Sequence, residues 1–191
     1  MATTTTRDDM FGELATPVAI GAVAGVATGL MANLLRKAVV QAPTVFAGNW
    51  DQALAAEHAA TLKIFDLLEK TDETQATRRG FLLMQLKHAL GKHAFQEENV
   101  IYAMMRDHDL KEAADHLNHD HGYVKQYLFE LTELPRDDAG WLPKVREFRA
   151  MIEKHMREEE DELFPRLRGG LSEEQNRHVT AAMNKAGLKL A

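Results

Sequence analysis

Hydrophobic and polar residues recur along most of the chain with the spacing of amphipathic helices. Four segments place apolar residues at alternating steps of three and four, the pattern of a helix with one buried face. They cover residues 50–70, 77–106, 111–134 and 140–166. No run of β-branched residues alternates with polar ones, so no strand is predicted. Short connections force long neighbouring helices to lie antiparallel, and the predicted fold is therefore an all-α, up-down-up-down four-helix bundle.

The segment before Pro43 follows a different pattern. Residues 17–35 carry no charge, and Gly21, Gly25 and Gly29 recur every four residues on one face of a predicted helix. We expect this extra glycine-rich helix to pack on the bundle or on the same helix of another subunit. The second arrangement would make the protein a homo-oligomer, which is the expected state. Membrane attachment is the alternative, because the segment is long enough to cross a bilayer and its glycine spacing permits close helix pairing.

A short helix is predicted after the bundle. Ser172 and Gln175 have the spacing of a capping box, in which each side chain bonds the backbone N–H of the other residue. Gly187 stands where this helix is expected to end, since glycine is common just past a helix C-terminus. The chain then divides into the tail and glycine-rich helix at residues 1–43, the bundle at residues 44–168, and the short C-terminal helix at residues 169–191.

Histidines and glutamates interrupt the inward apolar stripe of the bundle. Each of the four predicted helices turns a single histidine inward, and two of them add a glutamate one turn later on the same face. The second helix continues its stripe through Val100 and Met104. A buried carboxylate is costly unless it is paired or bound to a metal, so these polar residues need a common partner. They are His58, His93, His121 and His155, with Glu97 and Glu159.

These residue types indicate a pair of metal ions. Imidazole nitrogen and carboxylate oxygen are ligands that Fe, Mn and Zn accept well. Two carboxylates able to bridge, together with four imidazoles, suit two ions about 3.5–4 Å apart. Each ion would receive two histidines and a share of both glutamates, which leaves coordination positions for an oxo, hydroxo or exogenous ligand.

The remaining histidines and the acidic residues beside the motifs are expected to have outer roles. Glu98 and Glu160 each follow a predicted ligand, and they would face solvent or orient a ligand from behind. A local distortion next to His121 would rotate His119 inward, so His119 is the exception to watch. Five histidines lie off the inward stripe and are expected at the surface or behind the ligands: His88, His108, His116, His119 and His178.

The composition of the 191 residues excludes several other kinds of site. Without cysteine there is no disulfide framework, iron–sulfur cluster or thiolate zinc site. A net charge of −6, with no cluster of Lys and Arg, argues against nucleic-acid binding. No acidic residue has a histidine three positions later, so the ExxH motif of ferritin-like di-iron proteins is absent.

The acidic start is unlike a secretory signal, and the expected location is the cytoplasm, with membrane association as the alternative.

Four motifs occur in a specific order: an isolated His58, HAFQE from His93 to Glu97, Asp120-His121, and HMREEEDELFP from His155 to Pro165. This order resembles the bacterial hemerythrin-like, or HHE cation-binding, family over residues 50–168. The resemblance implies a four-helix bundle that holds a non-haem di-iron centre. It also implies that the four inward histidines are terminal ligands and that Glu97 and Glu159 are bridging carboxylates.

The chain departs from the oxygen-carrying members of that family at two positions. They have a fifth histidine where this chain has Lys125, and an aspartate where it has Glu160. Four histidines leave a more open metal pair, so reaction with O2, peroxide or NO, or sensing of these molecules, is expected as much as reversible oxygen carriage. Three tyrosines are candidates for a vacant coordination position: Tyr102, Tyr123 and Tyr127.

The residue pattern and the resemblance together predict a non-haem di-iron protein that binds or reacts with a small diatomic or peroxidic ligand. The expected cofactor is two Fe ions with an oxo or hydroxo bridge, and Zn or Mn are the alternative metals. Oxidoreductase activity toward peroxide, O2 or NO is left open. The alternative function is a metal-dependent sensor or assembly module that signals through the N-terminal helix, and a purely structural metal site is the third hypothesis.

Overall fold

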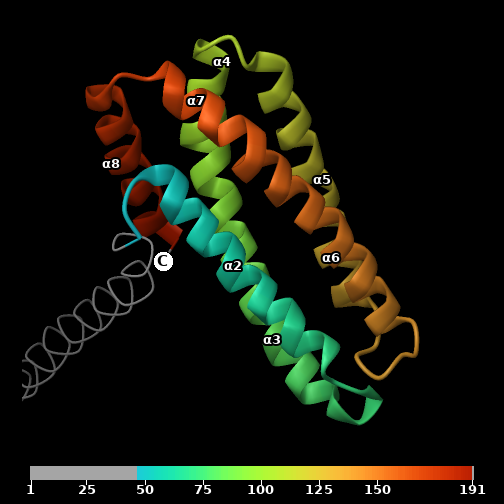
Figure 1. The fold of residues 1–191 in the computed structure, drawn as a ribbon. Coiled ribbons are helices and arrows are strands. Elements are labelled where there is room, and N and C mark those ends of the chain that lie inside the picture. Colours follow the sequence, from blue (N-terminus) through green and yellow to red (C-terminus); the bar gives the residue numbers. More distant parts are fainter. Residues whose placement is uncertain (1–46, 191) are drawn as a thin grey trace, which may run out of the picture. The chain divides into compact units, whose positions relative to one another are not determined.

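The computed structural model describes residues 47–190, and every regular element in that range is a helix (Figure 1). The prediction of an all-α fold is therefore confirmed for this part of the chain. The predicted glycine-rich helix and its oligomer contact lie outside the described residues. Between residues 47 and 190, no helix combines the length and the apolar character needed to span a membrane.

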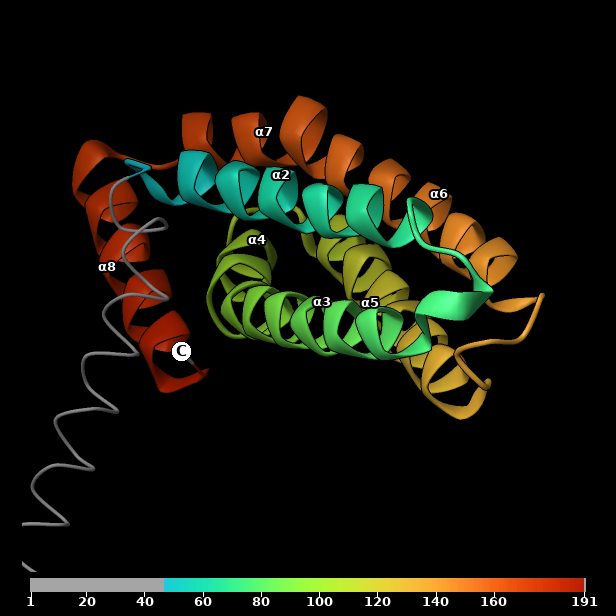
Figure 2. The ribbon, with the colours of Figure 1, turned by 90° about the horizontal axis from the view of Figure 1, so that it is seen from below.

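Four long helices form the bundle and lie antiparallel to their neighbours in the chain. In Figure 2, α2 and α6 form one layer, and α3 and α5 form the layer beneath it. The four helices are α2 at Trp50–Glu69, α3 at Ala76–Gln96, α5 at Lys111–Glu133 and α6 at Trp141–Glu158. The predicted segments 50–70 and 111–134 agree with α2 and α5 to within a few residues. The predicted segments 77–106 and 140–166 begin with α3 and α6 but extend past their ends into the helical turns that follow.

Two of the long helices contain a π turn and continue beyond it. The turn η2 at Glu97–Ile101 joins α3 to α4 at Tyr102–Asp107. The turn η3 at Glu159–Leu163 joins α6 to α7 at Phe164–Gly170. Each π turn begins at one of the two predicted bridging glutamates. A π turn holds one more residue than an α turn, and such bulges are frequent at functional sites.

The first π turn corrects part of the predicted inward face. Steps of three and four place Val100 and Met104 inward, but both are only partly buried. Instead Ile101, Tyr102 and Met105 are fully buried. The extra residue in η2 advances the buried face by one position, which the helical period alone does not reveal.

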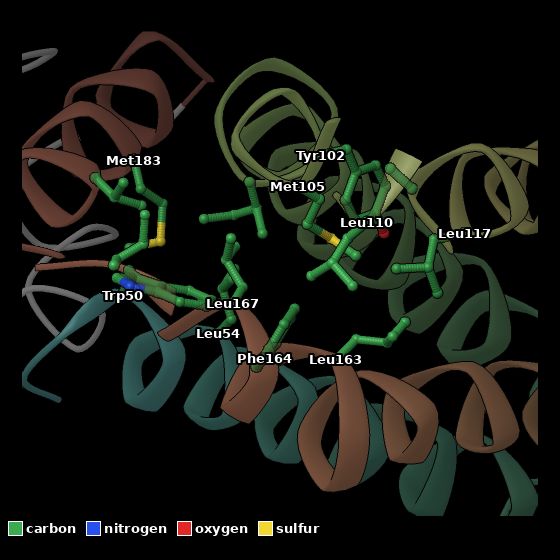
Figure 3. Packing of buried hydrophobic residues seen from close by; sticks show 14 of the residues in the cluster. Trp50, Leu54, Tyr102, Met105, Leu110, Leu117, Leu163, Phe164, Leu167 and Met183 are labelled. Atoms are coloured by element: carbon green, nitrogen blue, oxygen red, sulfur yellow. The ribbon is translucent and has the colours of Figure 1, made fainter. Parts of the chain in front are cut away.

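The apolar core forms two clusters, one toward each end of the bundle. Along every long helix, the inward histidine lies between residues of the first cluster and residues of the second. The first cluster includes Trp50, Leu54, Met105, Leu117, Phe164 and Met183, and Figure 3 shows its packing. The second includes Phe65, Leu86, Val124, Leu131, Trp141 and Phe148.

The last helix, α8 at Glu173–Leu190, packs against α2, α3 and η2. Its capping box is confirmed: Gln175 Oε1 accepts from Ser172 N–H at 2.8 Å, and Ser172 Oγ accepts from Gln175 N–H at 3.2 Å. The predicted end at Gly187 is wrong, because the helix continues to Leu190 with Gly187 buried inside it. Burial of this glycine against the bundle outweighs its tendency to end a helix.

Candidate metal centre

The six predicted ligand residues come together in the middle of the bundle. Each long helix contributes one histidine, and each π turn contributes its first glutamate. All six side chains are buried, with no more than 3% of any residue exposed. Their convergence is observed, whereas their binding of metal remains a prediction. The residues are His58, His93, Glu97, His121, His155 and Glu159.

Four of these residues form one set of potential ligands, which we call the four-donor group: His58, His93, Glu97 and Glu159. The Nε2 atoms of His58 and His93 lie 2.9 Å apart. His93 Nε2 is 3.1 Å from Glu97 Oε2, and His58 Nε2 is 3.4 Å from Glu159 Oε2. One donor atom from each residue lies within 4.8 Å of all the others, close enough for a single ion to contact the whole group.

A second set, the three-donor group, consists of Glu97, His121 and His155. His121 Nε2 lies 3.3 Å from Glu97 Oε2. His155 Nε2 lies 3.4 Å from Glu159 Oε2, so the second glutamate also borders this set. Glu97 belongs to both groups, which is the position of a bridging carboxylate.

Every histidine of the centre has an acidic residue at its outer nitrogen. His58 Nδ1 donates to Glu160 at 2.6 Å, His93 Nδ1 to Glu57 at 3.2 Å, and His121 Nδ1 to Glu98 at 3.0 Å. His155 Nδ1 lies 3.5 Å from Asp120 Oδ2. Histidines that bind metal almost always direct their second nitrogen to a carboxylate or carbonyl, which sets the tautomer and the ring orientation. All four rings therefore direct Nε2 toward the centre.

Of the three candidate tyrosines, only Tyr102 reaches the centre. Its hydroxyl donates to Glu159 Oε1 at 2.7 Å, and it lies 3.3 Å from Glu97 Oε2 and 3.2 Å from His121 Nε2. Tyr102 follows η2 directly, so the π turn carries its side chain inward. Tyr123 is exposed, and Tyr127 stacks on Phe148 in the second apolar cluster.

Among the protein groups alone, the neighbouring glutamates favour the protonated forms of His93 and His121. Burial lowers the pKa of His93, but Glu97 and Glu57 raise it by more than burial lowers it. The pKa of His93 is therefore well above its ordinary value. Burial likewise lowers the pKa of His121, while hydrogen bonds to Glu97 and Glu98 raise it to about 9. Burial raises the pKa of Glu97, but the two histidines hold it well below its usual range. A divalent cation here would replace these protons.

Several buried polar atoms of the centre have no hydrogen-bond partner within the described part of the chain. They are Glu97 Oε1, Glu159 Oε2, and both ring nitrogens of His155. Leaving such atoms unpaired away from water costs folding free energy. Cations placed among these nitrogen and oxygen atoms would satisfy the ones that face the centre, so the residues fit a metal site.

The other histidines lie outside the centre, as expected. His88, His119 and His178 are exposed, and His116 is exposed near Glu158. His108 is partly buried, and its Nδ1 lies 2.9 Å from the Met104 carbonyl oxygen.

Two outer carboxylates, Glu57 and Asp120, were missed by sequence reasoning. Each stands directly before a predicted histidine ligand, yet each contacts a histidine of a different helix: Glu57 reaches His93, and Asp120 approaches His155. The signal was an acidic residue adjacent to an inward histidine. The partner depends on how the helices meet, which the spacing along one helix does not contain.

Comparison with known proteins gives a consistent result. A family model described as "Hemerythrin HHE cation binding domain" matches residues 51–167. An uncharacterized hemerythrin-like protein of Schizosaccharomyces pombe is 28% identical over 99 residues, which cover 50% of this chain and 49% of that protein. A Nostoc protein named DNA nickase is 23% identical over 142 residues, which cover 74% of this chain and 40% of that protein. The chain thus spans less than half the length of these two relatives. No solved structure matches.

Proposed function

Because this chain belongs to the hemerythrin HHE cation-binding domain family, we propose that it is a non-haem di-iron protein that binds or reacts with O2, peroxide or NO. One observation carries the proposal. Four imidazoles direct Nε2 at two buried carboxylates, while acidic residues stand behind all four rings. This arrangement prepares the imidazoles to bind cations before any cation arrives.

The donor set fits non-haem iron better than it fits a structural zinc ion. Two histidines and one carboxylate with open positions are the ligands typical of non-haem Fe(II) sites that react with oxygen, and the three-donor group has this composition. Structural zinc sites, by contrast, are usually closed with four protein ligands. The proposed cofactor is therefore two Fe ions, with Glu97 shared by the two donor groups and Glu159 in the four-donor group at the border of the other.

The protein residues have separate tasks in this proposal. The bound iron pair supplies redox chemistry toward small ligands. Glu97 and Glu159 offset the positive charge of the ions and hold them together. Tyr102 stands beside the three-donor group, where its hydroxyl is an additional oxygen donor. The apolar clusters on both sides exclude bulk water, which strengthens each electrostatic contact at the centre.

Anaerobic metal loading tests the proposal. Metal-free protein is loaded anaerobically with Fe(II), desalted and analysed for metal, and the iron-loaded sample is then exposed separately to O2, H2O2 and NO. We expect two irons per chain and a change in the near-ultraviolet and visible spectrum with at least one of the three ligands. A single iron per chain, or a spectrum inert to all three ligands, would contradict it. The variant His88→Ala, at an exposed position on α3, is the control for variants that remove a histidine of the centre, and it should bind as much iron as the natural protein.

The name of the Nostoc relative describes an activity that we do not propose for this chain. The chain spans 40% of that protein, and its own net charge of −6 without a cluster of Lys and Arg is unfavourable for binding phosphates. Supercoiled plasmid incubated with the iron-loaded protein is expected to stay supercoiled when oxidants and reductants are excluded. Metal-dependent nicking under those conditions would overturn this expectation.

The sensor or assembly hypothesis stays a prediction. It requires a signal through the glycine-rich N-terminal helix, which lies outside the described residues. The homo-oligomer expected through that helix also stays a prediction, and sedimentation of the full chain with and without iron tests both ideas.

A further inference from the structure

Two histidines of the centre belong to the same kind of three-residue arrangement. In each, a lysine pairs with a glutamate, and that glutamate accepts a hydrogen bond from the Nδ1 atom of the histidine. The buried triad consists of Lys92, Glu57 and His93, and the exposed triad consists of Lys125, Glu98 and His121. One triad stands behind each donor group, because His93 belongs to the four-donor group and His121 to the three-donor group.

The contact distances of the two triads are nearly equal. Lys92 Nζ lies 2.9 Å from Glu57 Oε1, and Glu57 Oε2 lies 3.2 Å from His93 Nδ1. In the exposed triad, Glu98 Oε1 makes both contacts, each at 3.0 Å. In both triads the carboxylate therefore lies between an ammonium group and an imidazole N–H.

The two triads differ in how much water reaches the lysine. The Lys92 side chain is 8% exposed and that of Glu57 is 13% exposed. The Lys125 side chain is 66% exposed and that of Glu98 is 28% exposed. An exposed ion pair is weak and is screened by salt, whereas a pair shielded from water is screened much less. The same geometry should consequently act with different strength on the two histidines.

The lysine charge changes what the carboxylate does to the imidazole. A carboxylate behind a metal-binding histidine raises the basicity of the ring. An ammonium group paired with the same carboxylate draws negative charge away from that hydrogen bond, so the ring becomes a poorer electron donor. Glu160 and Asp120, which stand behind the other two histidines, pair with histidines instead. The lysines thus set one imidazole of each donor group apart from the other.

We propose that both lysines are positioning residues, which hold the glutamate in place and lower the electron donation of one imidazole in each donor group. The lysine of the buried triad does so at any salt concentration, whereas the lysine of the exposed triad does so mainly at low salt. Bound iron is then easier to reduce than it would be without the lysines, since less electron density reaches it. This consequence for iron rests on the proposed function, but the effect on the histidines is independent of it.

The His93 Nδ1–H resonance tests the buried triad without metal. Full-length, metal-free protein with labelled histidine is examined by proton and nitrogen NMR at neutral pH. Lys92→Met should strengthen the hydrogen bond from His93 to Glu57 and move the proton resonance to higher chemical shift. Lys92→Gln, which keeps a hydrogen-bond donor without the charge, should move it in the same direction. Lys87→Met, at an exposed position on α3, is the matched control and should leave it unchanged.

Substitution of Glu57 tests whether the lysine acts through this carboxylate. In Glu57→Gln the lysine and the histidine no longer share a carboxylate, so a further Lys92→Met change should not move the His93 resonance. A shift of equal size in both backgrounds, or no shift in Lys92→Met, would overturn the proposal. Circular dichroism establishes that the variants are folded, and Lys92→Gln decides the outcome if Lys92→Met is not.

Salt distinguishes the exposed triad from the buried one. The Debye length falls from about 10 Å at 0.1 M salt to about 3 Å at 1 M salt. Over this range, the His121 Nδ1–H resonance of the natural protein should move toward its position in Lys125→Met, while the His93 resonance stays in place. Movement of both resonances by the same amount, or of neither, would overturn the difference assigned to the two triads.

The reduction potential of the iron-loaded protein tests the consequence for iron. At equal iron content and a fixed potential, Lys92→Met is expected to shift the ratio of Fe(III) to Fe(II) about tenfold toward Fe(III), equal to about 59 mV for one electron. Lys87→Met should leave the ratio unchanged. A shifted His93 resonance with an unchanged potential would overturn the effect on electron donation. Failure to bind two irons would contradict the proposed function, and the resonances of the metal-free protein would still decide the role of the lysines.

Discussion

The two donor groups of the centre share Glu97 and differ in almost everything else. The four-donor group has two glutamates and two histidines whose Nε2 atoms lie 2.9 Å apart. The three-donor group has one glutamate and two histidines, and the Tyr102 hydroxyl lies 3.2 Å from His121 Nε2 of this group. A site with more protein donors holds an ion more tightly and leaves less room for a ligand. In our proposal the first group retains metal and the second group meets the small molecule.

Removing the Glu97 carboxylate should have the largest effect on iron binding, because both donor groups lose a donor. The change Glu97→Ala also exposes the histidines to one another without their shared counter-charge. We expect loss of both ions, with an iron affinity that falls by more than the roughly 10–100-fold seen when an outer hydrogen-bond partner is removed. Metal analysis after anaerobic loading and desalting measures this.

The control for this change is Glu162→Ala, at an exposed position in the second π turn. Its metal content should equal that of the natural protein. Circular dichroism establishes that both variants remain helical. If Glu97→Ala keeps one ion at full occupancy, Glu97 does not serve both groups.

The second-largest effect on iron binding is expected from removing one histidine of either donor group. His155→Ala leaves the three-donor group with two donors, whereas His58→Ala leaves the four-donor group with three. We therefore expect His155→Ala to keep one ion and lose the other, and His58→Ala to keep both with weaker binding. Iron content at increasing free Fe(II) gives the comparison, and the reverse order of losses would contradict the assignment.

A smaller effect is expected from Tyr102→Phe, which removes one oxygen and keeps the ring. The second ion should bind about tenfold more weakly, equal to about 1.4 kcal/mol, and the first ion should weaken less, because Tyr102 also donates to Glu159 of the four-donor group. Tyr127→Phe is the control, since Tyr127 packs on Phe148 away from the centre. Equal weakening of both ions, or no change in either, would remove Tyr102 from the three-donor side.

The smallest predicted effect is a pH dependence that differs between metal-free and loaded protein. Burial lowers the pKa of His121, but Glu97 and Glu98 raise it to about 9. A folded-state pKa above the unfolded value stabilises the fold fully below about pH 6.5, and this stabilisation is lost as pH rises through about 9. The melting temperature of metal-free protein should therefore fall by on the order of a few degrees over this range.

Iron competes with the same protons, so its binding should strengthen as pH rises. Thermal melts of both forms between pH 6 and 9.5 should consequently show a widening gap in favour of the loaded protein. A metal-free melting temperature that rises with pH would contradict the protonation assigned to His121.

The helical period was sufficient to predict the long helices and the six convergent residues. Leu54, His58 and Phe65 share one face because a regular helix returns every three to four residues, and that regularity holds over most of the bundle. A histidine at such a position was visible because a polar residue inside an apolar stripe needs a partner.

The features that the sequence did not reveal depend on irregularity or on contacts between helices. The sequence of η2 has no feature that indicates a π turn. The shift of the buried face that buries Tyr102 and leaves Met104 partly exposed could therefore not be predicted. The outer pair of Glu57 with His93 joins α2 to α3, and its formation depends on their relative register. The prediction that α8 ends at Gly187 was wrong, because packing of α8 against the bundle outweighs the tendency of glycine to end a helix.

The two donor groups are expected to hold two ions unequally. Anaerobic titration of metal-free protein with Fe(II), followed by isothermal calorimetry and by Mössbauer spectra at each stage of filling, tests it most directly. We expect two binding steps of different affinity, with one iron environment appearing first and a second, distinct environment following it. A single step that fills one ion, or two ions that appear together in one environment, would contradict it.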